Sequence, residues 1–448
     1  MRQRAFIQRV RLAAALSLLL ATAHASLAAE ENAHAKPFFE RDVALGDWGG
    51  VRSPLEDRGV TLGIHYAQEV LGVVHGGLSP GAEYNGLLEV DLDLDLEKLA
   101  GWHGALLHTS GYAAVGKSLS AVHSGDDSNV SNINMPHTAR LFELWLEQKL
   151  GSSFSIRFGM LAVDSQFYDS GGDAFGAKGG LLFLNSDFGA TPILSFNVPE
   201  PIFPIAAPGL SLIVKPTEAL SFRAAIYQGN LASNVPGFIP STQSDDHGLN
   251  FDLDADEGAL LIAEAVFALH PSPPTGDKAV AAPRPLGGIY KLGGFYHTDG
   301  FTQWKNGRGV SGDGGGYFVA NQMLWLENDH DNQGLSAFVR FGYAPPGRNV
   351  LDLTGDGGLN YRGFLPGRDD DLCGFGVSCK HYSRDFATSE LRAGNHGRDH
   401  ETIFEFTYHA AVAPWLAVQP DFQYVLHPAG DHNARDAVVA GVRVAMDF

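Results

Sequence analysis

Long apolar runs and basic residues are both scarce in this chain of 448 residues. After the N-terminal region, no stretch reaches the roughly 20 consecutive apolar residues that a helix needs to span a bilayer. Lys and Arg number 31 against 51 Asp and Glu, which gives a net charge of −20. Because nucleic acids attract basic surfaces, this acidic excess argues against a nucleic-acid partner.

Catalytic and cofactor-binding motifs are also lacking. We find no Ser/His/Asp arrangement with a nucleophile-elbow glycine pattern, and no phosphate-binding glycine loop between a strand and a helix. His396 and His400 have the spacing of a metal-binding pair on a helix, but Gly394 and Gly397 favour a turn there. We therefore predict neither an enzyme nor a resident cofactor or metal.

The N-terminus has the pattern of a secretory signal peptide. Four arginines, at positions 2, 4, 9 and 11, precede an apolar run from Leu12 to Ala21, and small residues follow at Ala23 and Ala25. The run is too short to cross a bilayer as a helix. We predict that residues 1–29 are a signal peptide and that the mature chain is exported.

Cysteine occurs only twice, at Cys373 and Cys379. The pair brackets a glycine-containing segment within a polar stretch, residues 349–384, that we expect to form a loop. Because an exported protein matures in an oxidising compartment, we predict a disulfide that pins this loop. A zinc site is disfavoured, since no third cysteine exists and His381 is the only close imidazole.

Alternation of apolar and polar residues with period two dominates the rest of the chain. The last twelve residues, Ala437 to Phe448, are apolar on one face and carry Arg443 and Asp447 on the other. Residues 89–96 alternate valine and leucine with four acids, which would be costly in a packed core but are solvated in a water-filled lumen. The pattern predicts an all-β fold, a transmembrane antiparallel β-barrel of about 16 strands whose last strand pairs with the first.

One short extension and several long connections complete the expected organisation. Residues 30–60 are predicted to form an N-terminal extension with a short helix, and residues 61–448 the barrel. Long polar stretches between strand patterns are candidate outer loops or segments folded into the lumen. These stretches are residues 118–136, 231–250, 271–285 and 349–384.

Four blocks of sequence resemble the OprB family of carbohydrate-selective porins. They are Leu45–Gly50 with Arg52, Leu144–Gln148 with Arg157–Gly159 and Asp164, Phe183–Ser186 with Phe188–Gly189, and Gln419–Tyr424 with His427–Pro428. Their order is kept from Leu45 to Phe448, so the resemblance covers nearly the whole mature chain. It implies a monomeric outer-membrane barrel, narrowed inside, through which glucose and related monosaccharides diffuse passively.

One strand pattern supplies most of the candidate pore-lining residues. The apolar residues at 142, 144 and 146 are expected to face lipid, so the residues between them would face the lumen. Charged groups there can replace water around sugar hydroxyls, and aromatic faces can carry pyranose rings. Equally, the charges can form salt bridges that brace the wall without touching a solute. The candidates are Glu143, Trp145 and Glu147 on this strand, Arg157 on the next, Asp164 just beyond it, and Arg52 in the N-terminal extension.

Other functions remain open at this point. The expected partners are sugars on the inside and outer-membrane lipid and lipopolysaccharide on the outside. A general diffusion porin without sugar selectivity would share these features. A barrel enzyme would need a serine and a histidine at the lipid boundary, where the outward faces are almost wholly apolar. A secreted β-sandwich is opposed by the terminal Phe448 and by acids placed where its core would be.

Overall fold

The computed structural model describes residues 36–135, 137–171, 178–229, 247–253, 255–270, 285–328 and 332–448. The predicted signal peptide, residues 1–29, lies outside the described residues, as do most of the predicted connections 231–250 and 271–285. No helix in the described part of the chain is long and apolar enough to cross a membrane.

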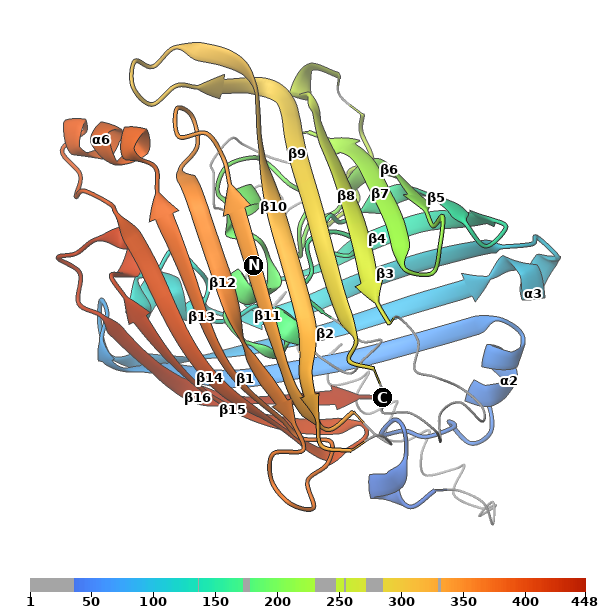
Figure 1. Ribbon diagram of the computed structural model, residues 1–448. Helices are drawn as coiled ribbons and strands as arrows, with labels where there is room; N and C mark the ends of the chain where they lie inside the picture. Colours follow the sequence, from blue (N-terminus) through green and yellow to red (C-terminus); the bar gives the residue numbers. More distant parts are fainter. Residues whose placement is uncertain are drawn as a thin grey trace, which may run out of the picture.

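The described residues form sixteen antiparallel strands that close into one barrel, as predicted (Figure 1). Each strand pairs with its neighbours in sequence, and β1 pairs with β16 to close the wall. The strands are β1 (Val60–Gly76), β2 (Gly81–Asp95), β3 (Ala105–Gly116), β4 (Thr138–Leu150), β5 (Phe154–Leu161), β6 (Ala207–Val214), β7 (Leu220–Gln228), β8 (Ala259–Leu269), β9 (Gly288–Thr302), β10 (Gly309–Leu326), β11 (Gly334–Tyr343), β12 (Leu351–Arg362), β13 (Leu372–Tyr382), β14 (His400–Ala413), β15 (Leu416–Leu426) and β16 (Ala437–Asp447).

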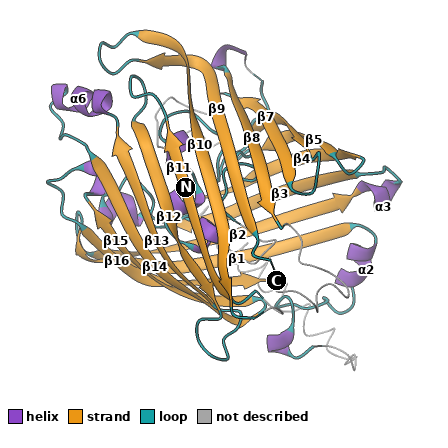
Figure 2. Cartoon of the chain, viewed as in Figure 1, coloured by secondary structure: helices purple, strands orange, loops and turns teal. Residues whose placement is uncertain are grey.

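Helices in the described residues are short; η1 and α2 precede β1, and the others lie in connections between strands (Figure 2). The longest, α6, begins after Ser383, whose hydroxyl accepts a hydrogen bond from the Phe386 backbone at 3.3 Å and caps the helix. The helices are η1 (Phe38–Glu40), α2 (Arg52–Asp57), α3 (Leu96–Ala100), η2 (Ser120–Ser124), η4 (Gly179–Leu182), α4 (Ser186–Gly189), α5 (Pro192–Ser195), η6 (Ala255–Glu257), α6 (Arg384–Arg392) and η8 (Pro428–Gly430).

Alternation along the strands gives the barrel an apolar outside and a polar inside. On β11, Phe341 is 53% exposed on the outer face, whereas Arg340 is 1% exposed on the inner face. Leu292 on β9 is 67% exposed. So many exposed large apolar side chains on one surface are stable only when hydrocarbon covers them. The outer face of the barrel is therefore a lipid-facing surface.

Backbone pairing and an ion pair join β1 to β16, the two strands that close the barrel. Val70 of β1 lies opposite Val442 of β16, and both face outward. On the inner face, the Arg443 guanidinium donates to the Glu69 carboxylate at 2.6 and 2.9 Å. The Phe448 backbone N–H donates to the Ile64 carbonyl at 2.9 Å. The last strand thus closes the barrel, as its one-sided apolar pattern predicted.

A β-bulge in β4 corrects one predicted face. Thr109 of β3 pairs with Leu144 and Gly111 with Leu141, so a single β3 residue opposes both Phe142 and Glu143. The extra residue reverses the alternation, and both of these side chains are buried. The prediction that Phe142 faces lipid is therefore wrong.

The stretch 349–384 also differs from its prediction, because most of it forms β12 and β13 rather than a loop. Cys373 and Cys379 both lie on β13, six residues apart, and both thiols are free. A strand rises about 3.3 Å per residue, so their Cα atoms are roughly 20 Å apart. A disulfide needs Cα atoms within about 7 Å. The predicted disulfide is wrong.

Two connections fold into the barrel. We call residues 117–135, between β3 and β4, the first insert, and residues 162–171 and 178–206, between β5 and β6, the second insert; the former contains the described part of the predicted connection 118–136. The second insert carries η4, α4 and α5, drawn in green inside the wall in Figure 1. Its apolar side chains pack in clusters with inward residues of the strands, Phe183 and Phe188 against Phe338 of β11 for example. These inserts narrow the lumen.

Candidate functional site

A cavity of about 1200 Å³ lies inside the barrel. Its lining combines the inner faces of β2, β3, β4, β9 and β16 with residues of both inserts. Small-molecule sites in proteins measure roughly 300–1,000 Å³, so the space admits a small solute together with water. The inserts therefore leave a cavity of molecular dimensions instead of filling the lumen.

Carboxylates dominate the charge of this cavity. Nine Asp or Glu side chains line it, against the guanidinium groups of Arg348 and Arg443 and the imidazole of His108. Some of these carboxylates are paired, as Asp187 is with Lys380 of β13 at 3.4 Å. The remaining excess gives the cavity a negative potential, which attracts cations and repels anions.

Glu143 lies at the cavity and holds the start of the second insert. Its carboxylate accepts hydrogen bonds from the Ala162 backbone at 2.9 Å and from the Ser165 hydroxyl at 3.1 Å. The bulge in β4 directs Glu143 inward beside Phe142, and both residues line the cavity. The predicted lumen-facing residue is thus at the cavity wall, with one function already visible, the anchoring of the insert.

Asp164 also lines the cavity, three residues after β5 ends. Its carboxylate accepts a hydrogen bond from the Phe203 backbone at 3.2 Å. Burial, with a contribution from the nearby Glu143 charge, raises the pKa of Asp164 to about 7. Burial likewise raises the pKa of Glu200, another lining residue, to about 8. Both groups titrate close to neutral pH.

Trp145, Glu147 and Arg157 form a compact cluster that does not line this cavity. The Arg157 guanidinium donates to Glu147 at 2.7 Å and lies over the Trp145 ring, 3.7 Å from its centroid. His108 stacks on the same indole at 4.6 Å. Trp145 is 7% exposed, so these groups and its other neighbours cover the indole. These contacts correspond to the alternative in which the charges form salt bridges that brace the barrel wall without touching a solute.

Arg52 lies on α2 at the end of the barrel where the chain terminates (Figure 1). Its guanidinium donates to Glu56 at 2.8 Å and to the Phe448 carbonyl at 3.4 Å, and it lies over the Trp48 ring at 5.3 Å. It does not line the cavity. The contacts fasten the N-terminal segment to the last residue of the barrel.

Several cavity residues were not identified from the sequence. Asn129, Asn132 and Asn134 of the first insert line the cavity, as does Trp304 between β9 and β10. Among the described residues, the Asn132 Oδ1 and the Trp304 Nε1 are buried without a hydrogen-bond partner. Such groups are rare in folded proteins. The asparagine-rich composition of residues 129–134 was the available signal.

Charged side chains of the wall hold the second insert in place. The Arg340 guanidinium of β11 pairs with Asp356 at 2.8 Å and donates to the carbonyls of Asp187 and Tyr168 at 2.5 and 3.4 Å. The carboxylate of Glu405 on β14 accepts from the backbone of Leu184 and Asn185. Fixed on several strands, the insert is a rigid constriction of the lumen.

Comparison with known proteins agrees with this architecture. The model of the carbohydrate-selective porin family, OprB, matches residues 79–448. The chain belongs to the OprB family of carbohydrate-selective porins. Porin B of Pseudomonas aeruginosa is 25% identical over 440 residues, covering 90% of this chain and 91% of that protein. A putative porin, QuiX, of Acinetobacter baylyi is 24% identical over 91% of this chain and 94% of its own length.

The solved structure of Pseudomonas putida OprB at high pH has the same fold. It superimposes with a TM-score of 0.80 at 25% sequence identity and covers 92% of this chain and 100% of the solved chain. The family, the lipid-facing surface and the closed barrel of sixteen strands place this porin in the bacterial outer membrane. Its relatives are channels, not enzymes.

Proposed function

We propose that this porin lets neutral monosaccharides such as glucose diffuse passively through the lumen, past the constriction made by the two inserts. The observation that carries the proposal is the cavity of about 1200 Å³, whose lining combines aromatic rings with amide and carboxylate side chains. Sugar hydroxyls can exchange hydrogen bonds with the amides and carboxylates of this lining. These contacts replace part of the hydration that the sugar loses on entry.

Ring faces and charge at the cavity favour the same class of solute. Phe196, Phe203, Phe301 and Trp304 line it beside amides and carboxylates, and this mixture suits the apolar faces and polar edges of a pyranose. The carboxylate excess disfavours sugar acids, because an anion would meet like charges. Glu143 and Asp164 are the predicted site residues that we place on the solute path, and we assign Trp145, Glu147 and Arg157 to bracing.

The surroundings of the barrel follow from the same proposal. A single chain encloses the whole cavity, so we propose that the porin works as a monomer. Its apolar outer face is in contact with outer-membrane lipid. Acidic side chains on the connections would be screened by divalent cations and lipopolysaccharide.

Planar-bilayer recording tests sugar passage. We expect the purified porin to form channels whose ion current falls as glucose is added, since a bound sugar occludes the constriction. Trp304→Phe replaces the indole in the cavity lining with a smaller ring, and the loss of ring contact with the sugar, about 0.5–1.5 kcal/mol, should weaken glucose block roughly two- to tenfold. The matched control is Trp102→Phe, because Trp102 is exposed in the turn after α3 and does not line the cavity.

Two results would contradict the proposal. Channels that glucose does not block at any concentration would indicate a general diffusion porin. Equal block of the wild type and Trp304→Phe would remove Trp304 from the solute path.

A further inference from the structure

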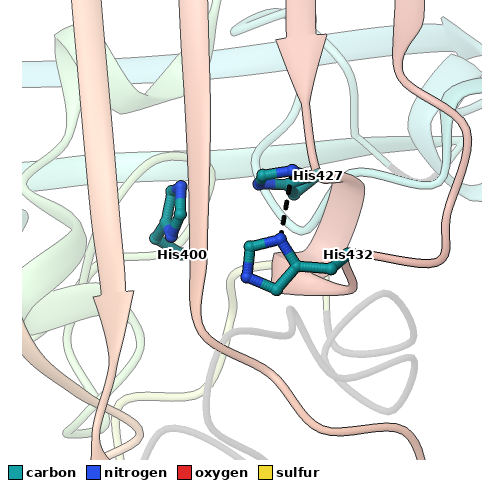
Figure 3. A group of neighbouring side chains, drawn as sticks. All are labelled: His400, His427 and His432. Atoms are coloured by element: carbon teal, nitrogen blue, oxygen red, sulfur yellow. Dashed lines mark hydrogen bonds between the residues drawn. The ribbon is translucent and has the colours of Figure 1, made fainter.

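Three histidines meet at the end of the barrel opposite the chain terminus. His400 begins β14, and His427 and His432 lie in the connection between β15 and β16 (Figure 3). One nitrogen of each ring lies within 4.8 Å of the corresponding atoms of the other two. Imidazole nitrogens converging in this way are the ligand type that zinc, copper and nickel ions prefer. We propose that these histidines form a binding site for a divalent transition metal of the zinc class.

Hydrogen bonds to one carboxylate orient two of the three rings as metal ligands. The Asp399 carboxylate accepts from the His400 Nδ1 at 2.9 Å and from the His432 Nε2 at 3.0 Å. A ring that gives its proton to a carboxylate keeps a lone pair on its second nitrogen, and metal-binding histidines are commonly oriented by such a carboxylate. Asp399 therefore acts as a positioning residue for both rings.

The distances are close to those of a metal site. The His432 Nδ1 lies 3.1 Å from the His427 Nε2, the interaction drawn as a dashed line in Figure 3. In a tetrahedral zinc site, metal–nitrogen bonds of about 2.0–2.1 Å place neighbouring nitrogens about 3.3 Å apart. Two of the three ligands are thus near their final separation. The third, on His400, lies within 4.8 Å of both.

The backbone of His427 has a conformation that is uncommon for a residue other than glycine. Its φ is +52°, in the left-handed region, and Pro428 follows it. Among the described residues, the Nδ1 of His427 is buried without a hydrogen-bond partner, so the ring has no other polar contact than the one to His432. A residue other than glycine held in such a conformation requires compensation, and metal ligation by Nε2 supplies it.

Access is open on the outer side of the cluster. The side chains of His400 and His432 are 32% and 47% exposed, so an ion can enter and water can complete its coordination. A bound ion would tie β14 to the connection between β15 and β16. The site would then fix the geometry of one side of the barrel mouth, independently of whether sugars pass through the lumen.

Zinc titration of the full-length porin tests the site. After treatment with a chelator, the detergent-solubilised protein is titrated with zinc chloride in a calorimeter. We expect one ion per chain with a Kd below about 100 μM. His432→Gln and His427→Asn each remove a ligand, the latter with a residue that tolerates positive φ. Both should weaken binding at least tenfold, and Asp399→Asn should weaken it roughly 10- to 100-fold.

A nearby histidine provides the matched control. His396 pairs with Asp431 at 3.0 Å and is not part of the cluster, so His396→Gln should bind zinc as the wild type does. Zinc-edge X-ray absorption should show three nitrogen neighbours at about 2.0–2.1 Å. Equal affinity of the wild type and His432→Gln, or no binding by the wild type at 1 mM zinc (about 10 times the expected upper limit for Kd), would overturn the proposal.

Discussion

Glu143 and Glu147 of β4 have different surroundings, although the alternation in the sequence predicts that both face the lumen. Glu143 lines the cavity and anchors the second insert, whereas Glu147 is neutralised by Arg157 outside the cavity lining. Alternation identifies a lumen-facing side chain, but it does not say whether an insert or an ion pair covers that side chain. At the scale of the residue, function therefore depends on what lies across the lumen.

Arg157→Met tests the bracing assignment at this scale. The substitution leaves the buried Glu147 carboxylate with only the more distant Lys149 ammonium, 4.0 Å away, which should lower the free energy of unfolding by about 1–3 kcal/mol. Glucose block should stay within twofold of wild type, because neither residue lines the cavity. Denaturant unfolding in detergent measures the first effect and bilayer recording the second. A large loss of glucose block at unchanged stability would instead place Arg157 on the solute path.

The β-bulge and the two inserts decide the shape of the lumen at the scale of the element. Strand count and closure follow from alternation, which is local. The bulge at Phe142 and Glu143 follows from pairing with β3, and the position of the second insert follows from contacts with strands far away in sequence. Neither leaves a repeating pattern in the chain.

Arg340→Met tests whether the second insert is the constriction. The variant loses the guanidinium that binds the Asp187 and Tyr168 carbonyls, and it leaves Asp356 buried without its partner, a loss of about 3–5 kcal/mol. We expect the barrel to assemble, with a higher and noisier single-channel conductance. Arg362→Met is the control, because Arg362 is the last residue of β12 and pairs with the exposed Asp370 in the connection to β13. Identical conductance of both variants would show that the insert does not limit flow.

At the scale of the whole molecule, the net negative charge should set which ions the channel prefers. The chain carries −20 at pH 7, and carboxylates outnumber cationic groups in the cavity. Two of these carboxylates, Asp164 and Glu200, have pKa values raised by burial to about 7 and about 8. Ion preference should therefore depend on pH near neutrality.

Reversal potentials in a potassium chloride gradient measure this dependence. From pH 6 to pH 9 both carboxyls lose their protons, so the preference for potassium over chloride should increase. Asp164→Asn should reduce the change. The same shifts affect folding: because the folded state holds these protons more tightly than the unfolded chain, the contribution of both groups to stability falls as pH rises from about 4 to 8. Equal reversal potentials at the two pH values would contradict the assignment.

The sequence alone determined the architecture and the family, because a barrel in lipid imposes period-two alternation on every strand and an apolar face on the last one. Four short blocks then indicated the OprB family, and the family match confirmed it. The tertiary structure decided what the lumen contains. It placed both cysteines on one strand, turned Phe142 inward, covered Trp145, and joined His400 to His427 and His432. Each of these depends on contacts between residues distant in the chain, and alternation within one strand carries no information about them.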